Sequence, residues 1–157
     1  MSFDWPQGSS AGTASCKAGH YKGSFIGIYS PSIAVAPVPI PVAGDIDLTL
    51  TKSQNGEFFD ITGGKVSGVA DLLFPFSADV RGTLNCTTMA LENGFLSNGT
   101  YIVGVIPYPF EGPLSAAYDK LTHAFTGGKW TVGEPKWTTP PSPYGGSGTW
   151  QANWVGP

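Results

Sequence analysis

Glycine and proline interrupt this chain so often that a helical fold is excluded. The 157 residues include 22 Gly and 14 Pro, and in a helix interior Gly costs about 1 kcal/mol and Pro about 3 kcal/mol relative to Ala. Four prolines, Pro41, Pro75, Pro109 and Pro143, are spaced 34 residues apart, and apolar residues flank the first three. Helical tetratricopeptide repeats have the same period, but they cannot carry a Gly or Pro every few residues. The spacing therefore predicts degenerate 34-residue repeats built from β-strands.

Alternation of residue types with a period of two predicts the strands themselves. We expect about ten strands, drawn from the eleven segments near residues 20–29, 45–51, 57–62, 65–73, 79–88, 90–92, 100–106, 114–120, 122–126, 129–132 and 148–155. Tight turns are expected at the pairs that accept positive φ, namely Asn55-Gly56, Gly63-Gly64, Asn93-Gly94, Asn98-Gly99 and Gly127-Gly128. The order predicts an all-β antiparallel up-and-down meander that closes as a curved barrel or a two-sheet sandwich, and it does not distinguish the two.

Proline and glycine also mark irregular places within this pattern. We expect residues 31–41 to be extended but unpaired, because every second residue from Pro37 onward is a proline without an N–H to donate. Glycines expected at inward-facing strand positions are Gly23, Gly27, Gly68, Gly82 and Gly104. Such glycines allow a sheet to bend sharply or to accommodate a large aromatic side chain.

Composition limits both the domain organisation and the partners. Residues 1–19 are rich in Gly, Ser and Ala and are expected to form a flexible arm, followed by a single β-domain over 20–157. The eight basic residues are scattered and the net charge is -3, so no basic face exists for nucleic acid or for an anionic bilayer. No apolar run is long enough for a transmembrane helix, so no membrane span is expected.

Two cysteines indicate the compartment. Cys16 and Cys86 are separated by 70 residues, which is too far for a local redox or zinc motif. They either pair or are inert core thiols, and the low charge and strand-rich pattern favour a disulfide. Closing a loop of this length would stabilise the fold by roughly 4 kcal/mol in the chain-entropy model. We therefore expect an exported protein, extracellular or in the cell envelope.

Three segments carry a resemblance. Cys16-Lys-Ala-Gly-His-Tyr-Lys-Gly, Phe-Pro-Phe-Ser-Ala-Asp-Val-Arg-Gly-Thr-Leu-Asn-Cys86 and Gly-Gly-Ser-Gly-Thr-Trp150 resemble uncharacterised exported or lipid-anchored bacterial β-domain proteins. The resemblance spans residues 16–154 and implies paired cysteines and a cell-envelope location. It supplies no catalytic residue.

Residues that could support catalysis or bind a metal are sparse. His20 and His123 have no carboxylate or second ligand at metal spacing, and no serine elbow motif is present. Asp45, Asp47 and Asp79 lack the loop pattern of a calcium site and are interpreted as solubilising charges. We therefore predict a protein that is not an enzyme, with no catalytic residue, no metal site and no cofactor.

Binding residues are predicted from aromatic and apolar clusters. Trp150 and Trp154 occupy alternating strand positions, where a core role is expected, whereas Trp137 and Tyr144 lie in a Pro-rich loop and could form an exposed platform. The apolar run 33–42, with Ile33, Val35, Val38 and Ile40, is either a loop packed across the open end of the sheet or an exposed docking patch.

Two functions fit these residues. The first is a structural or adhesive β-domain that acts through an apolar or aromatic surface, by self-association as a homo-oligomer or with a protein partner. The alternative is a module that binds a glycan or a small apolar ligand at a barrel mouth or on the aromatic platform.

Overall fold

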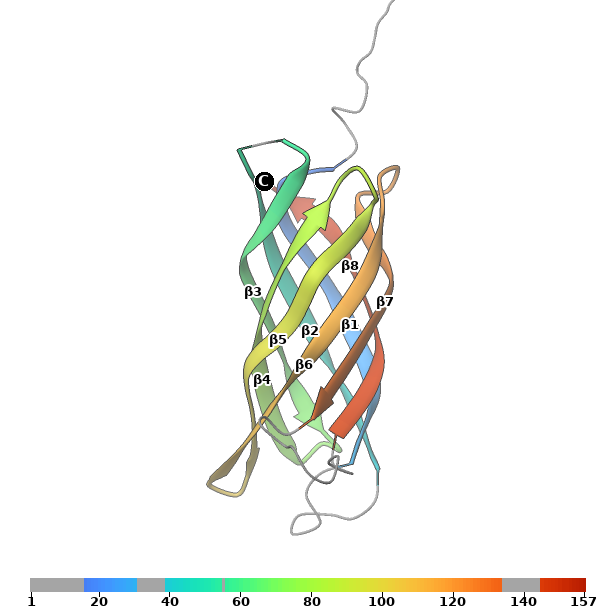
Figure 1. Ribbon diagram of the computed structural model, residues 1–157. Coiled ribbons are helices and arrows are strands. Elements are labelled where there is room, and N and C mark those ends of the chain that lie inside the picture. Colours follow the sequence, from blue (N-terminus) through green and yellow to red (C-terminus); the bar gives the residue numbers. More distant parts are fainter. Residues whose placement is uncertain (1–15, 31–38, 55, 134–144) are drawn as a thin grey trace, which may run out of the picture.

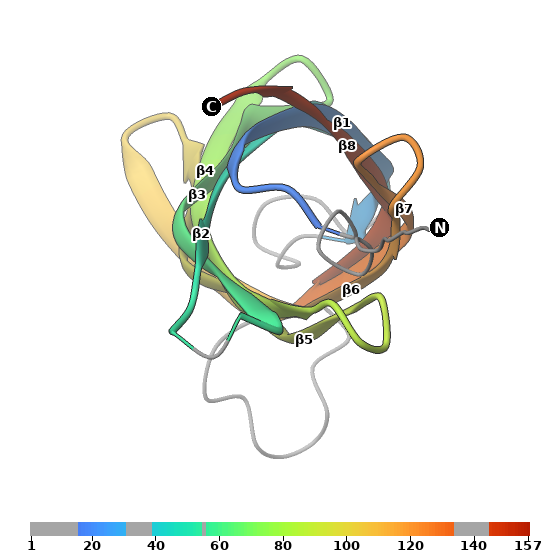
Figure 2. The ribbon, with the colours of Figure 1, turned by 90° about the horizontal axis from the view of Figure 1, so that it is seen from above.

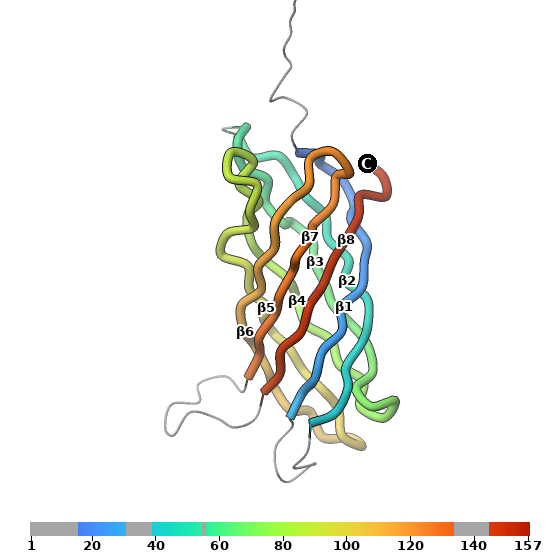
Figure 3. Tube along the Cα trace, turned by 90° about the vertical axis from the view of Figure 1, so that its right-hand side faces the viewer, coloured from blue at the N-terminus to red at the C-terminus, as the bar shows by residue number. Residues whose placement is uncertain are grey.

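The computed structural model describes residues 16–30, 39–54, 56–133 and 145–157. They form eight antiparallel strands, in which each strand pairs with its neighbours in sequence and β8 pairs with β1. The strands are β1 (Gly19–Ser30), β2 (Ile40–Lys52), β3 (Phe58–Ala70), β4 (Phe74–Asn85), β5 (Ala90–Val103), β6 (Ile106–Asp119), β7 (Ala124–Gly133) and β8 (Gly145–Gly156). The predicted all-β meander is thus confirmed, and the β1–β8 seam closes it as a barrel (Figures 1 and 3).

The expected number of about ten strands is wrong, because glycine pairs predicted to be turns lie inside strands. Gly63-Gly64 is part of β3, Asn93-Gly94 and Asn98-Gly99 are part of β5, and Gly127-Gly128 is part of β7. Asn93, Asn98 and Gly127 have φ values of 54°, 53° and 59°, and the strand register shifts next to each. A β-bulge and a tight turn both use a residue at positive φ, so an Asn-Gly or Gly-Gly pair in the sequence is compatible with either.

The prolines lie near the beginnings of strands. Pro41 and Pro75 are the second residues of β2 and β4, and Pro109 is the fourth residue of β6. Pro41 pairs in register with Ile28, so the expectation that the segment stays unpaired through Pro41 is wrong; a strand beginning tolerates a proline. Pro143 lies outside the described residues, and the 34-residue repeat stays a prediction.

The barrel has two chemically different ends. We call the end formed by residues 26–30, 40–44, 67–77, 100–110, 131–133 and 145–148 the apolar end; it carries the β3–β4 and β5–β6 turns at the bottom of Figure 1. The opposite end carries the β2–β3, β4–β5 and β6–β7 turns and the C-terminus. Residues 16–18 also lie there, and we call it the strapped end.

A short N-terminal strap is bonded to that end. Cys16 forms the predicted disulfide with Cys86 of the β4–β5 turn, with 6.1 Å between their Cα atoms. The Tyr21 hydroxyl donates to the Lys17 carbonyl at 2.5 Å, and Trp154 Nε1 donates to the Ala18 carbonyl at 3.0 Å. Figure 2, which views the barrel from above, shows this blue segment curving inside the ring of strands. The predicted flexible arm is thus bonded to the barrel from Cys16 onward, and residues 1–15 lie outside the described part.

The interior next to the strap is tightly packed. Tyr21, Leu48, Leu84, Phe125 and Ala152 all have 0% exposure. The rings of Tyr21 and Phe125 meet edge to face, with 5.3 Å between their centroids. This half of the barrel is a solid hydrophobic core, so any internal space must lie toward the apolar end.

Two tyrosine hydroxyls are buried in this core. Because Tyr21 donates to the Lys17 carbonyl, Tyr118 is the donor in the 2.6 Å hydrogen bond between the two hydroxyls. Burial raises the pKa of both phenols.

We expect this pair to make the fold sensitive to alkali. An unfolded tyrosine loses its proton near pH 10, whereas the folded pKa of each buried phenol is higher. The contribution of the pair to the free energy of unfolding is therefore fully present below about pH 10 and is lost as the pH rises further. Urea unfolding at pH 8 and pH 11 should show this fall, and a Tyr21→Phe/Tyr118→Phe variant should lose less over the same interval. An equal fall in both proteins would contradict this assignment.

Candidate functional site

The half of the barrel next to the apolar end contains a cavity of about 60 Å³. Its walls are Phe25, Tyr29, Ile40, Val42, Ile46, Val66, Ala70, Phe74, Phe76, Leu96, Tyr101, Phe110, Leu114, Trp130, Val132 and Trp150, and the exposed surface within it is entirely apolar. Ile40, Ala70 and Phe74 are terminal residues of their strands, so the cavity extends to the apolar end of the barrel.

Alternation of aromatic residues and glycines shapes the cavity walls. Trp130, Gly148 and Gly27 are consecutive partners across β7, β8 and β1. A Cβ added to Gly27 or Gly148 would lie 2.5 or 2.7 Å from Cζ2 of Trp130, so the indole ring covers both glycines. This confirms that Gly27 accommodates a large aromatic. The same expectation is wrong for Gly104, which lies in the β5–β6 turn with no atom within 4 Å of an added Cβ.

The rings around the cavity interlock edge to face. Tyr29 meets Tyr101 with 5.3 Å between centroids, and Phe25 meets Phe76 at 5.6 Å and Trp130 at 6.2 Å. Interlocked rings of this kind have few alternative rotamers, because each ring's edge is fixed against its neighbour's face. The cavity is therefore held open by rigid groups.

The chemistry of the walls decides what the cavity can hold. A water molecule needs about 10–15 Å³ of such space and two to four polar partners. This cavity is large enough for water, but the surface that the described residues expose in it is apolar. Space of this kind stays dry and accepts small apolar molecules.

The structure brings together only some of the predicted binding residues. Trp150 and Ile40 both line the cavity, and Trp150 Nε1 donates to the Ser115 carbonyl at 3.1 Å. Trp154 lies at the strapped end, where its ring stacks under the Lys17 ammonium, 3.8 Å from the ring centroid. Ile33, Val35, Val38, Trp137 and Tyr144 lie outside the described residues.

Most of the cavity wall was not identified from the sequence. Tyr29, Phe76, Tyr101, Phe110 and Trp130 contribute rings to it. The available signal was the inward phase of each strand, which already places Tyr29 on the same face as Phe25. The bulges in β5 obscured that phase for Tyr101, since an extra residue reverses the alternation.

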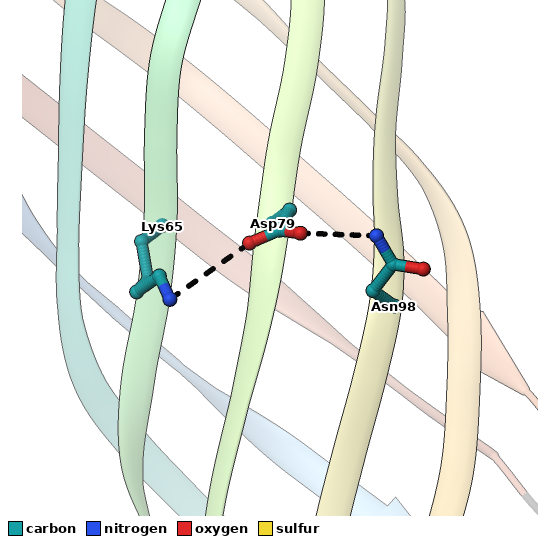
Figure 4. Close-up of polar contacts among 3 residues, drawn as sticks. All are labelled: Lys65, Asp79 and Asn98. Atoms are coloured by element: carbon teal, nitrogen blue, oxygen red, sulfur yellow. Dashed lines mark hydrogen bonds and ion pairs between the residues drawn. The ribbon is translucent and has the colours of Figure 1, made fainter.

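The predicted solubilising carboxylates lie on the outer wall. Asp79 Oδ1 is 3.9 Å from the Lys65 ammonium, and Asn98 Nδ2 donates to Asp79 Oδ2 at 3.0 Å (Figure 4). This pair is half-exposed and links β3, β4 and β5, where a salt bridge contributes little stability. Within the described ranges, no group of three or more His, Cys, Asp or Glu side chains is arranged to bind a metal ion.

A second, wider groove of about 570 Å³ lies on the outer wall near the bulges of β4 and β5. Its polar side chains largely contact one another. Thr83 donates to Asp60 at 3.1 Å, and the guanidinium of Arg81 lies 5.0 Å from the centroid of the Phe95 ring. These groups therefore have partners within the protein.

Fold and cavity together define an eight-stranded up-and-down barrel that is strapped at one end and has an apolar interior cavity toward the other. No known protein family, curated protein sequence or solved structure matches the chain. No helix in the described residues is long and apolar enough to cross a membrane.

Proposed function

We propose that this protein binds a small apolar molecule inside its barrel. The observation that carries the proposal is the cavity, which is walled by apolar and aromatic side chains and lies in only one half of a barrel that is otherwise tightly packed. Binding sites for small molecules are typically concave, pre-formed and mostly apolar. The ligand class is a very small apolar group, such as the end of a short alkyl chain, since the cavity is only about 60 Å³ and the surface that the described residues expose in it is apolar.

Xenon is a suitable probe for this site, because a single atom suits a cavity of this size. We expect dissolved xenon to quench the fluorescence of Trp130 and Trp150, which line the cavity, and to do so saturably. An Ala70→Met variant should weaken this binding at least tenfold, because the longer side chain occupies the space beside Ala70 in the cavity wall.

The matched control is Ala117→Met, which makes the same change at an exposed position of β6 and should bind xenon like the wild type. Thermal unfolding of both variants shows whether they are folded. Equal weakening by both variants, or no saturable signal in the wild type, would refute the proposal.

We also propose that the protein functions in an oxidising, extracytoplasmic compartment. The Cys16–Cys86 disulfide supports this placement, since such bonds persist in oxidising compartments and are rare in the cytosol. The ligand-binding role requires no chemical step. The other function expected from the sequence, association through an apolar surface, would use residues on the outside of the barrel and not the cavity.

A further inference from the structure

Exposed apolar side chains on the outside of the barrel gather at one end. The apolar end carries seven large hydrophobic residues that are exposed, namely Ile26, Ile28, Val69, Leu72, Leu73, Val105 and Ile106. The two most exposed, Leu72 at 90% and Val105 at 92%, occupy the β3–β4 and β5–β6 turns. These hairpins are neighbours, because β4 pairs with β5, and both turns lie at the bottom of Figure 1.

The β3–β4 turn holds its leucine in an unfavourable backbone conformation. Asp71 and Leu72 have φ values of 50° and 60°, and Leu73 N donates to the Ala70 carbonyl at 3.0 Å. These features define a type I′ turn, in which Asn and Gly are strongly preferred. Leu72 is thus at a position that disfavours leucine on two grounds, its positive φ and its exposure to water.

The charge at this end selects the kind of partner. Among the described residues that form the apolar end, Asp71 is the only charged residue, so the described surface of this end offers no cation to attract an anionic surface. Two separate protruding tips would need two matching pockets on a rigid protein, whereas the fluid headgroup and acyl boundary of a bilayer admits them without such a match. We propose that Leu72, Leu73, Val105 and Ile106 insert into the surface of an electrically neutral lipid bilayer. This inference does not depend on the proposed ligand binding.

Flotation with phosphatidylcholine vesicles tests the proposal. We expect the wild-type protein to float with the vesicles, and a Leu72→Asn/Val105→Asn variant to bind at least tenfold more weakly, because amides replace two apolar side chains that enter the bilayer on binding. Leu121→Asn is the matched control, since Leu121 is 85% exposed in the β6–β7 turn at the opposite end. It should bind like the wild type.

Thermal unfolding shows whether the Leu72→Asn/Val105→Asn variant is folded, so that weaker binding is not mistaken for unfolding. Leu72→Asn alone should raise the melting temperature by roughly 2–4 °C, because Asn tolerates positive φ better than Leu. Three results would overturn the proposal: no flotation of the wild type, equal loss in the Leu121→Asn control, or binding that requires anionic lipid. Concentration-dependent dimerisation that Leu72→Asn abolishes, without vesicle binding, would assign these tips to a second copy of the chain instead.

Discussion

A Cys16→Ser/Cys86→Ser variant is expected to lose roughly 4 kcal/mol of the free energy of unfolding, because the unfolded chain regains the entropy of an open 70-residue loop. The loss should also include part of the strap. Lys17 and Ala18 accept hydrogen bonds from Tyr21 and Trp154, and these bonds hold only while the strap stays at the end of the barrel. Urea unfolding of the variant beside the wild type measures the difference.

Reduction provides an independent check on the same bond. Wild-type protein in a strong reductant should approach the stability of the double-serine variant, while the variant itself should not respond. A loss of less than about 1 kcal/mol in both experiments would contradict a structural role for this disulfide.

The second large effect is expected at Gly23, where β1 approaches β8. A Cβ at this position would lie 1.8 Å from the Gln151 carbonyl oxygen and 2.6 Å from the Ala152 Cα. Both atoms belong to backbone, which can yield only if the strand pair separates. We therefore expect Gly23→Ala to destabilise the barrel by about 3 kcal/mol or more, at or beyond the upper end of ordinary overpacking.

Gly63→Ala is the matched control for this change. Gly63 also lies in a barrel strand, but the nearest atoms to its added Cβ are side-chain atoms of Thr49 at 3.6 Å, an ordinary contact. The control should keep or slightly gain stability, since alanine restricts the unfolded chain. Similar melting temperatures for the two variants would contradict the close approach of β1 and β8.

Local patterns in the sequence predicted the individual strands better than they predicted the closure of the sheet into a barrel. The alternation from Tyr21 to Tyr29 correctly located β1, and the cysteine spacing correctly suggested a covalent bond. The choice between barrel and sandwich depends on the pairing of β1 with β8, whose residues are more than a hundred positions apart. No local signal reports such a contact, because each strand of either fold shows the same alternation.

The candidate site was predicted only in part for a related reason. The inward face of a strand can be read from its period, but the cavity depends on how rings from different strands interlock, as Phe25 does with Phe76 and Trp130. The exposed leucines of the β3–β4 turn were not predicted for a different reason. Leu72 and Leu73 continue the alternating stretch of β3 in the sequence, and only the turn geometry shows that they leave the barrel wall.

A crystal structure under xenon pressure tests the central claim most directly, since xenon occupies dry apolar cavities without needing a polar contact. The account predicts xenon inside the barrel toward the apolar end, between the rings of Tyr29, Phe76 and Trp130. Ordered water in that space, or side chains that fill it and leave no xenon site, would contradict the account.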